Sequence, residues 1–273
     1  MDLAQKGDCR SALPVLTRAL RPISGKELGF EAGMAAARCA MSLNELNPAL
    51  EAIAFLNREF PRNPQVLYVS THYFSELANR SARDLAASAP NSNEALELDA
   101  ESYEAQGKWD EAEKEYGMIL KKDPGAPGIH YRLGRIILSK PQTAASIPDA
   151  KEQFEAELKL HPHDAPSEFM LGDIARQGQQ WDDAINHFSS AAKIDESFSE
   201  AYLGLGMAFN AESKWPEAIA PLEKYVKMEP SDPAGHYQLA IAYARSGRRQ
   251  DAAQQMALQQ RMQKNKPGGP DSQ

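Results

Sequence analysis

The stretch LGDIARQGQQWDDAINHF, from Leu171 to Phe188, indicates the fold, because the spacing of its small and aromatic residues recurs along the chain. In it a Leu-Gly pair is followed by Trp181, then by Ala184, and finally by the aromatic ring of Phe188. The polar turn QGQQWDD separates two segments whose apolar residues recur at the period of an α-helix. The stretch therefore predicts two helices joined by a short turn.

The same arrangement recurs along the chain, first after 38 residues and then every 34 residues. The alanine that begins the second helix recurs, with steps of 38, 34, 34 and 34, at Ala112, Ala150, Ala184, Ala218 and Ala252. A second marker ends the units at Pro124, Pro162, Glu196 and Pro230. The Leu-Gly pair returns as Leu133-Gly134 and Leu205-Gly206, and alanine replaces the glycine in Leu239-Ala240. The chain is an internal repeat, and the longer step places an insertion in the loop sequence SKPQTAASIPDA.

The small residue of each Leu-Gly pair is expected to let the facing helix approach closely. A larger side chain at Gly172 would collide with the second helix, whose Trp181 and Phe188 fill the space beside Ala184. One hairpin alone leaves this apolar surface uncovered, so neighbouring hairpins must stack on one another.

These residues resemble the tetratricopeptide repeat family, in which a Leu-Gly pair, an alanine, an aromatic residue and a proline stand at fixed offsets. The resemblance implies an all-α, right-handed α-solenoid of antiparallel helix-turn-helix repeats, with about seven to eight hairpins. Five well-matched units fill residues 93–264, and they cover residues 93–125, 126–164, 165–197, 198–231 and 232–264.

Residues 1–92 carry a weaker form of the pattern, which predicts divergent hairpins of the same kind. Ala12, Ala49 and Ala78 take the place of the second-helix alanine, and the unit that ends at Pro90 is short, so its first helix or its turn is expected to be clipped. The first residues of the chain resemble the second helix of a unit whose first helix is missing. This favours a chain that starts inside a longer protein over an unusual N-terminal capping unit. The Pro- and Gly-rich tail, residues 265–273, is expected to be disordered.

The charge of the chain argues against nucleic acid as a partner. The formal net charge is -8 and the sequence pI is about 5.4, whereas affinity for phosphates rests on clustered Lys and Arg. No apolar run reaches the ~18 residues that span a bilayer, so no membrane insertion is expected. The absence of a signal peptide favours a cytoplasmic location, and a truncated N-terminus would leave a periplasmic or secreted location open.

The two cysteines, Cys9 and Cys39, are interpreted as packing residues. A disulfide between them is the less favoured alternative, because both lie near the N-terminal end, where adjacent hairpins can touch.

One stripe of the first helices is the candidate binding surface. In the family that the chain resembles, these positions face an extended peptide, and aromatic and Arg side chains are common at interface hot spots. The candidate residues are Tyr131, Arg135, Leu138, Phe169, Asp173, Arg176, Leu203, Met207, Asn210, Tyr237 and Ile241. Packing against adjacent helices is the alternative interpretation for the rings of Tyr131, Phe169 and Tyr237.

Charged residues add two hypotheses to this stripe. Arg135 and Arg176 come from successive units and are expected to take a carboxylate or phosphate together, unless Asp173 pairs with one of them. Residues 93–123 are acidic, with Glu97, Glu101 and Glu104 on the stripe, and residues 245–266 are basic. This asymmetry suits a bipolar partner or head-to-tail contact, and it also suits a solvated surface that keeps the array soluble.

The sequence offers little sign of catalytic, metal or cofactor chemistry. His161 and His163 are the one metal-like cluster, and they lack a third ligand in sequence, so no metal site and no cofactor are expected. No nucleophile, P-loop, dinucleotide or zinc-protease motif is present, so the chain is not expected to be an enzyme.

The leading hypothesis is a non-enzymatic scaffold that binds a protein or peptide segment in the concave groove of the array. Two alternatives remain open. The chain can be the regulatory or targeting segment of a larger enzyme or envelope protein, or it can be a self-association module.

Overall fold

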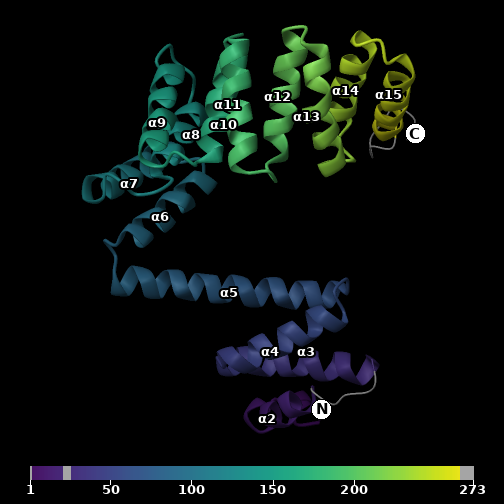
Figure 1. Ribbon diagram of the computed structural model, residues 1–273. Helices are drawn as coiled ribbons and strands as arrows, with labels where there is room; N and C mark the ends of the chain where they lie inside the picture. The colour runs from purple at the N-terminus through teal and green to yellow at the C-terminus, as the bar shows by residue number, and fades with distance from the viewer. Residues whose placement is uncertain (1, 21–25, 265–273) are drawn as a thin grey trace. The chain divides into compact units, whose positions relative to one another are not determined.

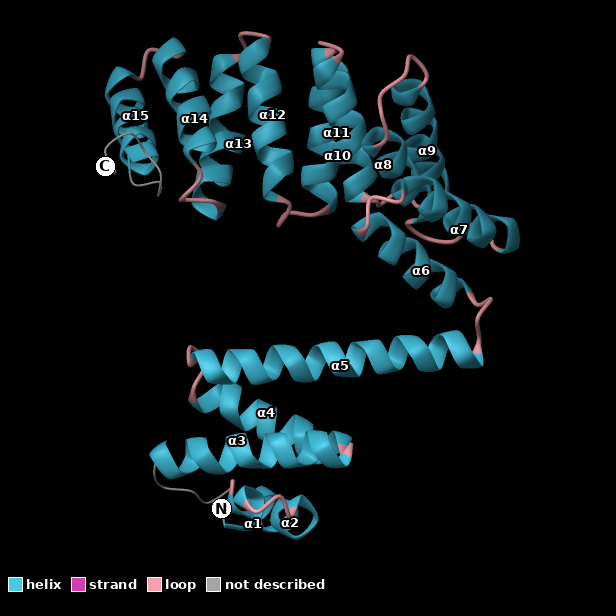
Figure 2. Ribbon diagram, turned by 180° about the vertical axis from the view of Figure 1, so that it is seen from behind, coloured by secondary structure: helices cyan, strands magenta, loops and turns pink. Residues whose placement is uncertain are grey.

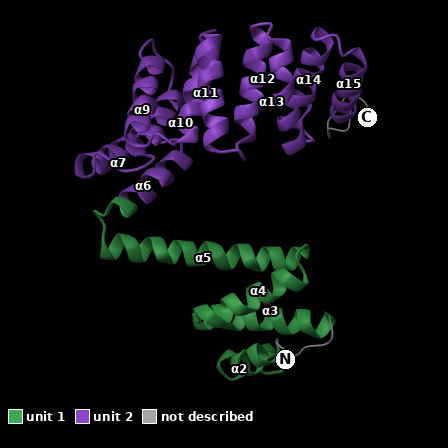
Figure 3. Ribbon diagram, in the orientation of Figure 1, with its two compact units in different colours: residues 1–95 green, residues 96–273 purple. Residues whose placement is uncertain are grey.

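The computed structural model describes residues 2–20 and 26–264, and the tail predicted to be disordered, residues 265–273, lies outside this part. The described residues form fifteen α-helices, and none of them lies in a strand (Figure 2). The all-α prediction is confirmed. The chain divides into two compact units, residues 1–95 and residues 96–273 (Figure 3).

The first unit contains five helices. They are α1 (Asp2–Gln5), α2 (Cys9–Ala19), α3 (Lys26–Leu43), α4 (Leu46–Glu59) and α5 (Pro64–Ser88). Helices α3 and α4 form a tight antiparallel hairpin because the contact face of α3 is built from small residues. Ala36 and Ala40 are fully buried, and a β-carbon on Gly33 would lie 2.7 Å from a methyl carbon of Leu56. Small residues on one helix thus let large residues of the other fill the interface.

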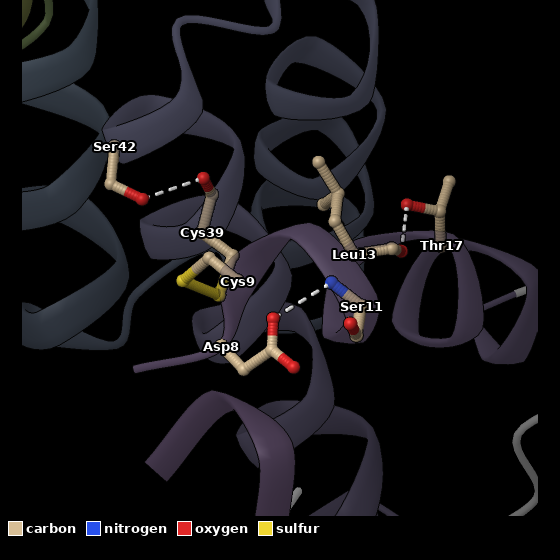
Figure 4. The surroundings of a disulfide bond; sticks show 7 residues. All are labelled: Asp8, Cys9, Ser11, Leu13, Thr17, Cys39 and Ser42. Atoms are coloured by element: carbon tan, nitrogen blue, oxygen red, sulfur yellow. Dashed lines mark hydrogen bonds between the residues drawn. A yellow bond between two sulfur atoms is a disulfide. The ribbon is translucent and has the colours of Figure 1, made fainter. Parts of the chain in front are cut away.

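Helix α2 is tied covalently to α3 (Figure 4), and the interpretation of the cysteines as packing residues was wrong. Cys9 at the start of α2 forms a disulfide with Cys39 of α3, and their Cα atoms lie 4.9 Å apart. The two residues meet because α2 packs beside the C-terminal half of α3. The repeat spacing of the sequence does not reveal which residues of α2 and α3 are in contact, so it does not predict that Cys9 and Cys39 form a disulfide.

The turn predicted before Ala78 is absent. Residues 64–88 form the single continuous helix α5, and Ala78 lies exposed within it. The sequence ELANRSARD in its middle contains no Gly or Pro and is rich in residues that favour helices, so nothing interrupts the helix. Only its first half is buried, through Val66, Val69, Ser70 and Tyr73. The short unit is therefore one long helix instead of a clipped hairpin.

The second unit is a row of five helical hairpins (Figure 1). Its helices are α6 (Asn93–Ala105), which crosses the boundary between the units, α7 (Trp109–Lys122), α8 (Ile129–Ser139), α9 (Ser146–Leu160), α10 (Ala165–Gln177), α11 (Trp181–Ile194), α12 (Ser199–Ala211), α13 (Trp215–Met228), α14 (Pro233–Arg245) and α15 (Arg249–Lys264). The predicted insertion is the longer loop between α8 and α9. All ten helices lie within residues 93–264.

Close approach at the small residue holds the hairpins that begin with α8, α10 and α12 together, as predicted. A β-carbon on Gly134 would lie 2.6 Å from the ring of Phe154, and one on Gly206 would lie 2.3 Å from Leu222. Phe154 and Leu222 have no exposed surface. The first and second helices therefore touch at the Leu-Gly pairs, and the opposite side of each first helix is left to form the candidate surface.

Candidate functional site

The candidate residues all lie on first helices, and we call their side of the second unit the first-helix face. Helix α8 carries Tyr131, Arg135 and Leu138; α10 carries Phe169, Asp173 and Arg176; α12 carries Leu203, Met207 and Asn210; α14 carries Tyr237 and Ile241. Residues four and three apart share one side of an α-helix. The repeat therefore brings one short row of side chains from each of four successive hairpins.

Arg135 is an exposed cation of the first-helix face. Its side chain is exposed, and its guanidinium carbon lies 5.8 Å from the centre of the Tyr131 ring. Among the described residues no carboxylate pairs with Arg135. The Tyr131 ring packs in turn against Phe154, with 6.0 Å between ring centres. The Tyr131 ring thus packs against Phe154 and also contacts the guanidinium of Arg135, which remains accessible to a ligand.

Arg176 is paired with a carboxylate of its own helix, so only Arg135 is left of the two arginines expected to bind an anion together. Its Nη2 and Nε atoms lie 2.6 and 2.9 Å from Oδ1 of Asp173, one helical turn earlier. Gln177 Nε2 donates to the other carboxylate oxygen at 2.7 Å. The expectation that Asp173 pairs with one of the arginines is confirmed.

Phe169 and Asn210 are used mainly inside the protein. The Phe169 ring lies 5.5 Å from Phe188 of α11 and 5.1 Å from Phe198, the N-cap residue of α12. Asn210 is only 6% exposed, and its Nδ2 donates to the main-chain oxygen and to Oε1 of Gln238, both at 3.0 Å. The Gln238 contact joins α12 to α14, so the geometry favours a structural role for Asn210.

The apolar part of the first-helix face lies on α12 and α14. Tyr237 is 45% exposed, and Leu203, Met207 and Ile241 are partly exposed. Such residues gain free energy when a partner covers them, at about 25 cal/mol for each Å² of apolar surface removed from water. The face thus has an apolar part on α12 and α14 and a cationic part at Arg135.

The acidic stripe on α6 is partly neutralised by a residue that the sequence did not single out. Nη2 of Arg132, on α8, lies 2.6 Å from Oε1 of Glu101, and its Nη1 lies 3.7 Å from Oε1 of Glu104. The hydroxyl of Tyr116 donates to Glu104 at 2.6 Å. Burial and then this hydrogen bond raise the pKa of Tyr116. These acids therefore hold α6, α7 and α8 together and are not all available to a partner.

His161, at a unit boundary, and His236, within α14, both make hydrogen bonds inside the protein. His161 Nε2 lies 3.1 Å from the main-chain oxygen of Gly125, and His236 Nδ1 lies 2.6 Å from Oε1 of Gln255. Searched over residues 2–20 and 26–264, the chain brings together no group of three His, Cys, Asp or Glu side chains that could hold a metal ion. Within the same residues, no helix is both long and apolar enough to cross a bilayer.

Comparison with known proteins identifies the family. The tetratricopeptide repeat profile matches residues 75–127, 98–152, 142–197, 169–233 and 203–270. Together these matches cover well over half of the chain. The chain belongs to the tetratricopeptide repeat family.

Solved structures agree on the fold. The crystal structure of MamA has a TM-score of 0.53 and 21% identity, covering 60% of this chain and 94% of that chain. MamA from Desulfovibrio magneticus RS-1, residues 41 to the end, gives 0.55 and 17%, covering 64% and 96%. YrrB, described as a TPR protein with an unusual peptide-binding site, gives 0.56 and 19%, covering 68% and 93%. No curated protein sequence matches the chain.

Proposed function

We propose that the second unit binds a protein segment on its first-helix face and acts as a non-catalytic scaffold. Exposure of Tyr237 beside Ile241, with Leu203 and Met207 on the preceding first helix, is the observation that carries the proposal. An aromatic ring that the protein's own core does not cover is a common anchor for a partner. The family membership supports a binding role, and YrrB is a related fold whose description names a peptide-binding site.

Charge defines the second part of the proposed contact. Arg135 is exposed and lies over Tyr131, and its guanidinium can donate two parallel hydrogen bonds to a carboxylate. The segment that this face would bind is therefore apolar where it crosses α12 and α14 and acidic where it reaches α8. A lysine-rich segment would meet an uncompensated cation at Arg135.

A binding role also agrees with how the protein uses its ionisable groups. Glu157 is 1% exposed, and its carboxylate accepts hydrogen bonds from the main-chain nitrogens of Gly128 and Tyr131, at 2.8 and 3.3 Å. It caps α8, whose N-cap residue is a glycine without a side chain of its own. Among the described residues, the most buried carboxylate therefore has a structural task.

The test is a pull-down from lysate with two matched triple variants that circular dichroism shows to be folded. The first carries Arg135→Ala, Met207→Ala and Tyr237→Ala. The second removes exposed side chains of the second helices, through Lys151→Ala, Asp183→Ala and Glu217→Ala. We expect partners to be lost from the first variant and kept by the second. Partners that survive the first variant and disappear with the second would refute the proposed face.

A further inference from the structure

The first unit contains a depression that the proposed function does not use. Helix α2 forms one wall, and the end of α3 with the start of α4 forms the other. Its lining consists of Arg10, Leu13, Pro14, Thr17, Arg18, Leu43, Glu45 and Pro48. The space measures about 910 Å³, part of it open to solvent, which is room for several side chains.

The floor of this depression is apolar. Leu13 is buried, and Leu43 and Pro48 are partly buried. The hydroxyl of Thr17 donates to the main-chain oxygen of Leu13 at 2.9 Å, so its hydrogen-bonding capacity is used within α2 (Figure 4). A ligand seated here would gain mainly by removing its own apolar side chains from water.

Two arginines of α2 line the depression. Arg10 and Arg18 are exposed, and within the part of the chain that the structure describes no carboxylate pairs with either of them. They are 18 − 10 = 8 residues apart, which is a rise of about 12 Å along the helix. Glu45 is the only acid of the lining. An occupant with two negative charges at similar separation would meet both arginines.

Pro14 leaves one main-chain oxygen of α2 without its usual hydrogen-bond donor. A proline within a helix has no N–H, so the main-chain oxygen of Arg10 cannot receive the bond that residue 14 would otherwise donate. A helical carbonyl is directed toward the residue four positions later, and Pro14 lines the depression. An N–H group of an extended peptide is a suitable donor to this oxygen.

The disulfide holds this wall in place. Cys9 precedes Arg10 directly, and its bond to Cys39 ties the first turn of α2 to α3. Asp8 also accepts a hydrogen bond from the main-chain nitrogen of Ser11 at 3.2 Å, which caps the helix (Figure 4). The first turn of α2, which carries Arg10, is therefore held in place before a ligand arrives.

We propose that this depression binds a short extended peptide segment with an acidic side chain at each end and apolar side chains between them. Four residue steps of an extended chain span about 13 Å, which matches the separation of Arg10 and Arg18. The apolar floor takes the central side chains, and the main-chain oxygen of Arg10 takes a peptide N–H. This second site is independent of the first-helix face.

The test uses the whole chain and a labelled five-residue peptide with glutamate at both ends and leucine between, followed by fluorescence anisotropy. Arg10→Glu with Arg18→Glu should weaken binding about 10- to 100-fold, because two charge-assisted contacts become repulsive. The matched control, Arg38→Glu with Arg62→Glu, makes the same charge change at exposed positions of the same unit outside the depression. It should bind like the wild-type protein.

Four outcomes would overturn the proposal. They are no binding by the wild-type protein at millimolar concentration, equal binding by the Arg10 and Arg18 variant, equal weakening by the control variant, and equal binding of a peptide with glutamine in place of glutamate. Circular dichroism and the near-ultraviolet spectrum would verify that both variants are folded. A wild-type dimer that the Arg10 and Arg18 variant loses would instead make a second copy the occupant, and sedimentation of the protein alone tests this.

Discussion

Gly172 lies directly against the ring of Phe188, so closely that a β-carbon on the glycine would stand 2.8 Å from two of the ring carbons. The same ring faces Gly204 of the next hairpin, where a β-carbon would lie 2.7 Å away. Phe188 therefore lies between glycines of two successive units. This contact joins the hairpin of α10 and α11 to its neighbour.

Gly172→Ala is expected to destabilise the second unit. The new methyl group would force Phe188 toward Gly204, and such overpacking outweighs the gain in helix propensity, for a net loss of about 1–2 kcal/mol. The measurement is the shift of the urea midpoint followed by circular dichroism.

Gly117→Ala is the matched control for this substitution. Gly117 lies inside α7 and has no atom within 4 Å of its β-carbon position, so alanine should stabilise the helix by about 0.5–1 kcal/mol. Equal effects of the two substitutions would show that the close contact at Phe188 does not matter for stability.

Reduction of the Cys9–Cys39 disulfide is expected to destabilise the first unit. A cross-link between residues 30 apart restricts the unfolded chain, and its loss costs about 3–4 kcal/mol on the chain-entropy account. Dithiothreitol should lower the unfolding midpoint of the wild-type protein and leave that of Cys9→Ser with Cys39→Ser unchanged. A wild-type midpoint that does not respond to the reductant would contradict the prediction.

The repeating part of the molecule could be predicted from the sequence, and the non-repeating part could not. The contact of Gly172 with Phe188 follows from a spacing that recurs, since every unit repeats the same register. The disulfide, the unbroken helix α5 and the pairing of Arg132 with Glu101 each occur once, and no period reveals them. On the first-helix face, the repeat period placed the candidate residues on the first helices. The period does not show that Arg176 pairs with Asp173 or that Asn210 donates to Gln238, because these contacts depend on the three-dimensional structure.

Alkaline pH should destabilise the protein partly through Tyr243. Burial, followed by the 2.6 Å hydrogen bond to Oε1 of Glu223, raises the pKa of Tyr243 to about 12. In the unfolded chain the phenol titrates near pH 10, so its contribution to stability is present below pH 10 and is lost as the pH rises toward about 12. Tyr243→Phe should show a smaller loss of stability between pH 9.5 and 11.5, measured by urea unfolding at each pH. Parallel curves for the two proteins would refute the role of this residue.

Asn210→Ala is expected to weaken the fold more than the binding of a partner. The substitution removes the two hydrogen bonds that the buried Asn210 side chain donates to Gln238 at 3.0 Å, which costs about 1–3 kcal/mol. Met207→Ala removes a partly exposed side chain one turn earlier on α12, so it should cost less stability and more partner binding. Urea midpoints and pull-down yields of the two variants separate these effects. A stable Asn210→Ala protein that loses its partner would return Asn210 to the binding surface and shift the centre of that surface toward the contact of α12 with α14.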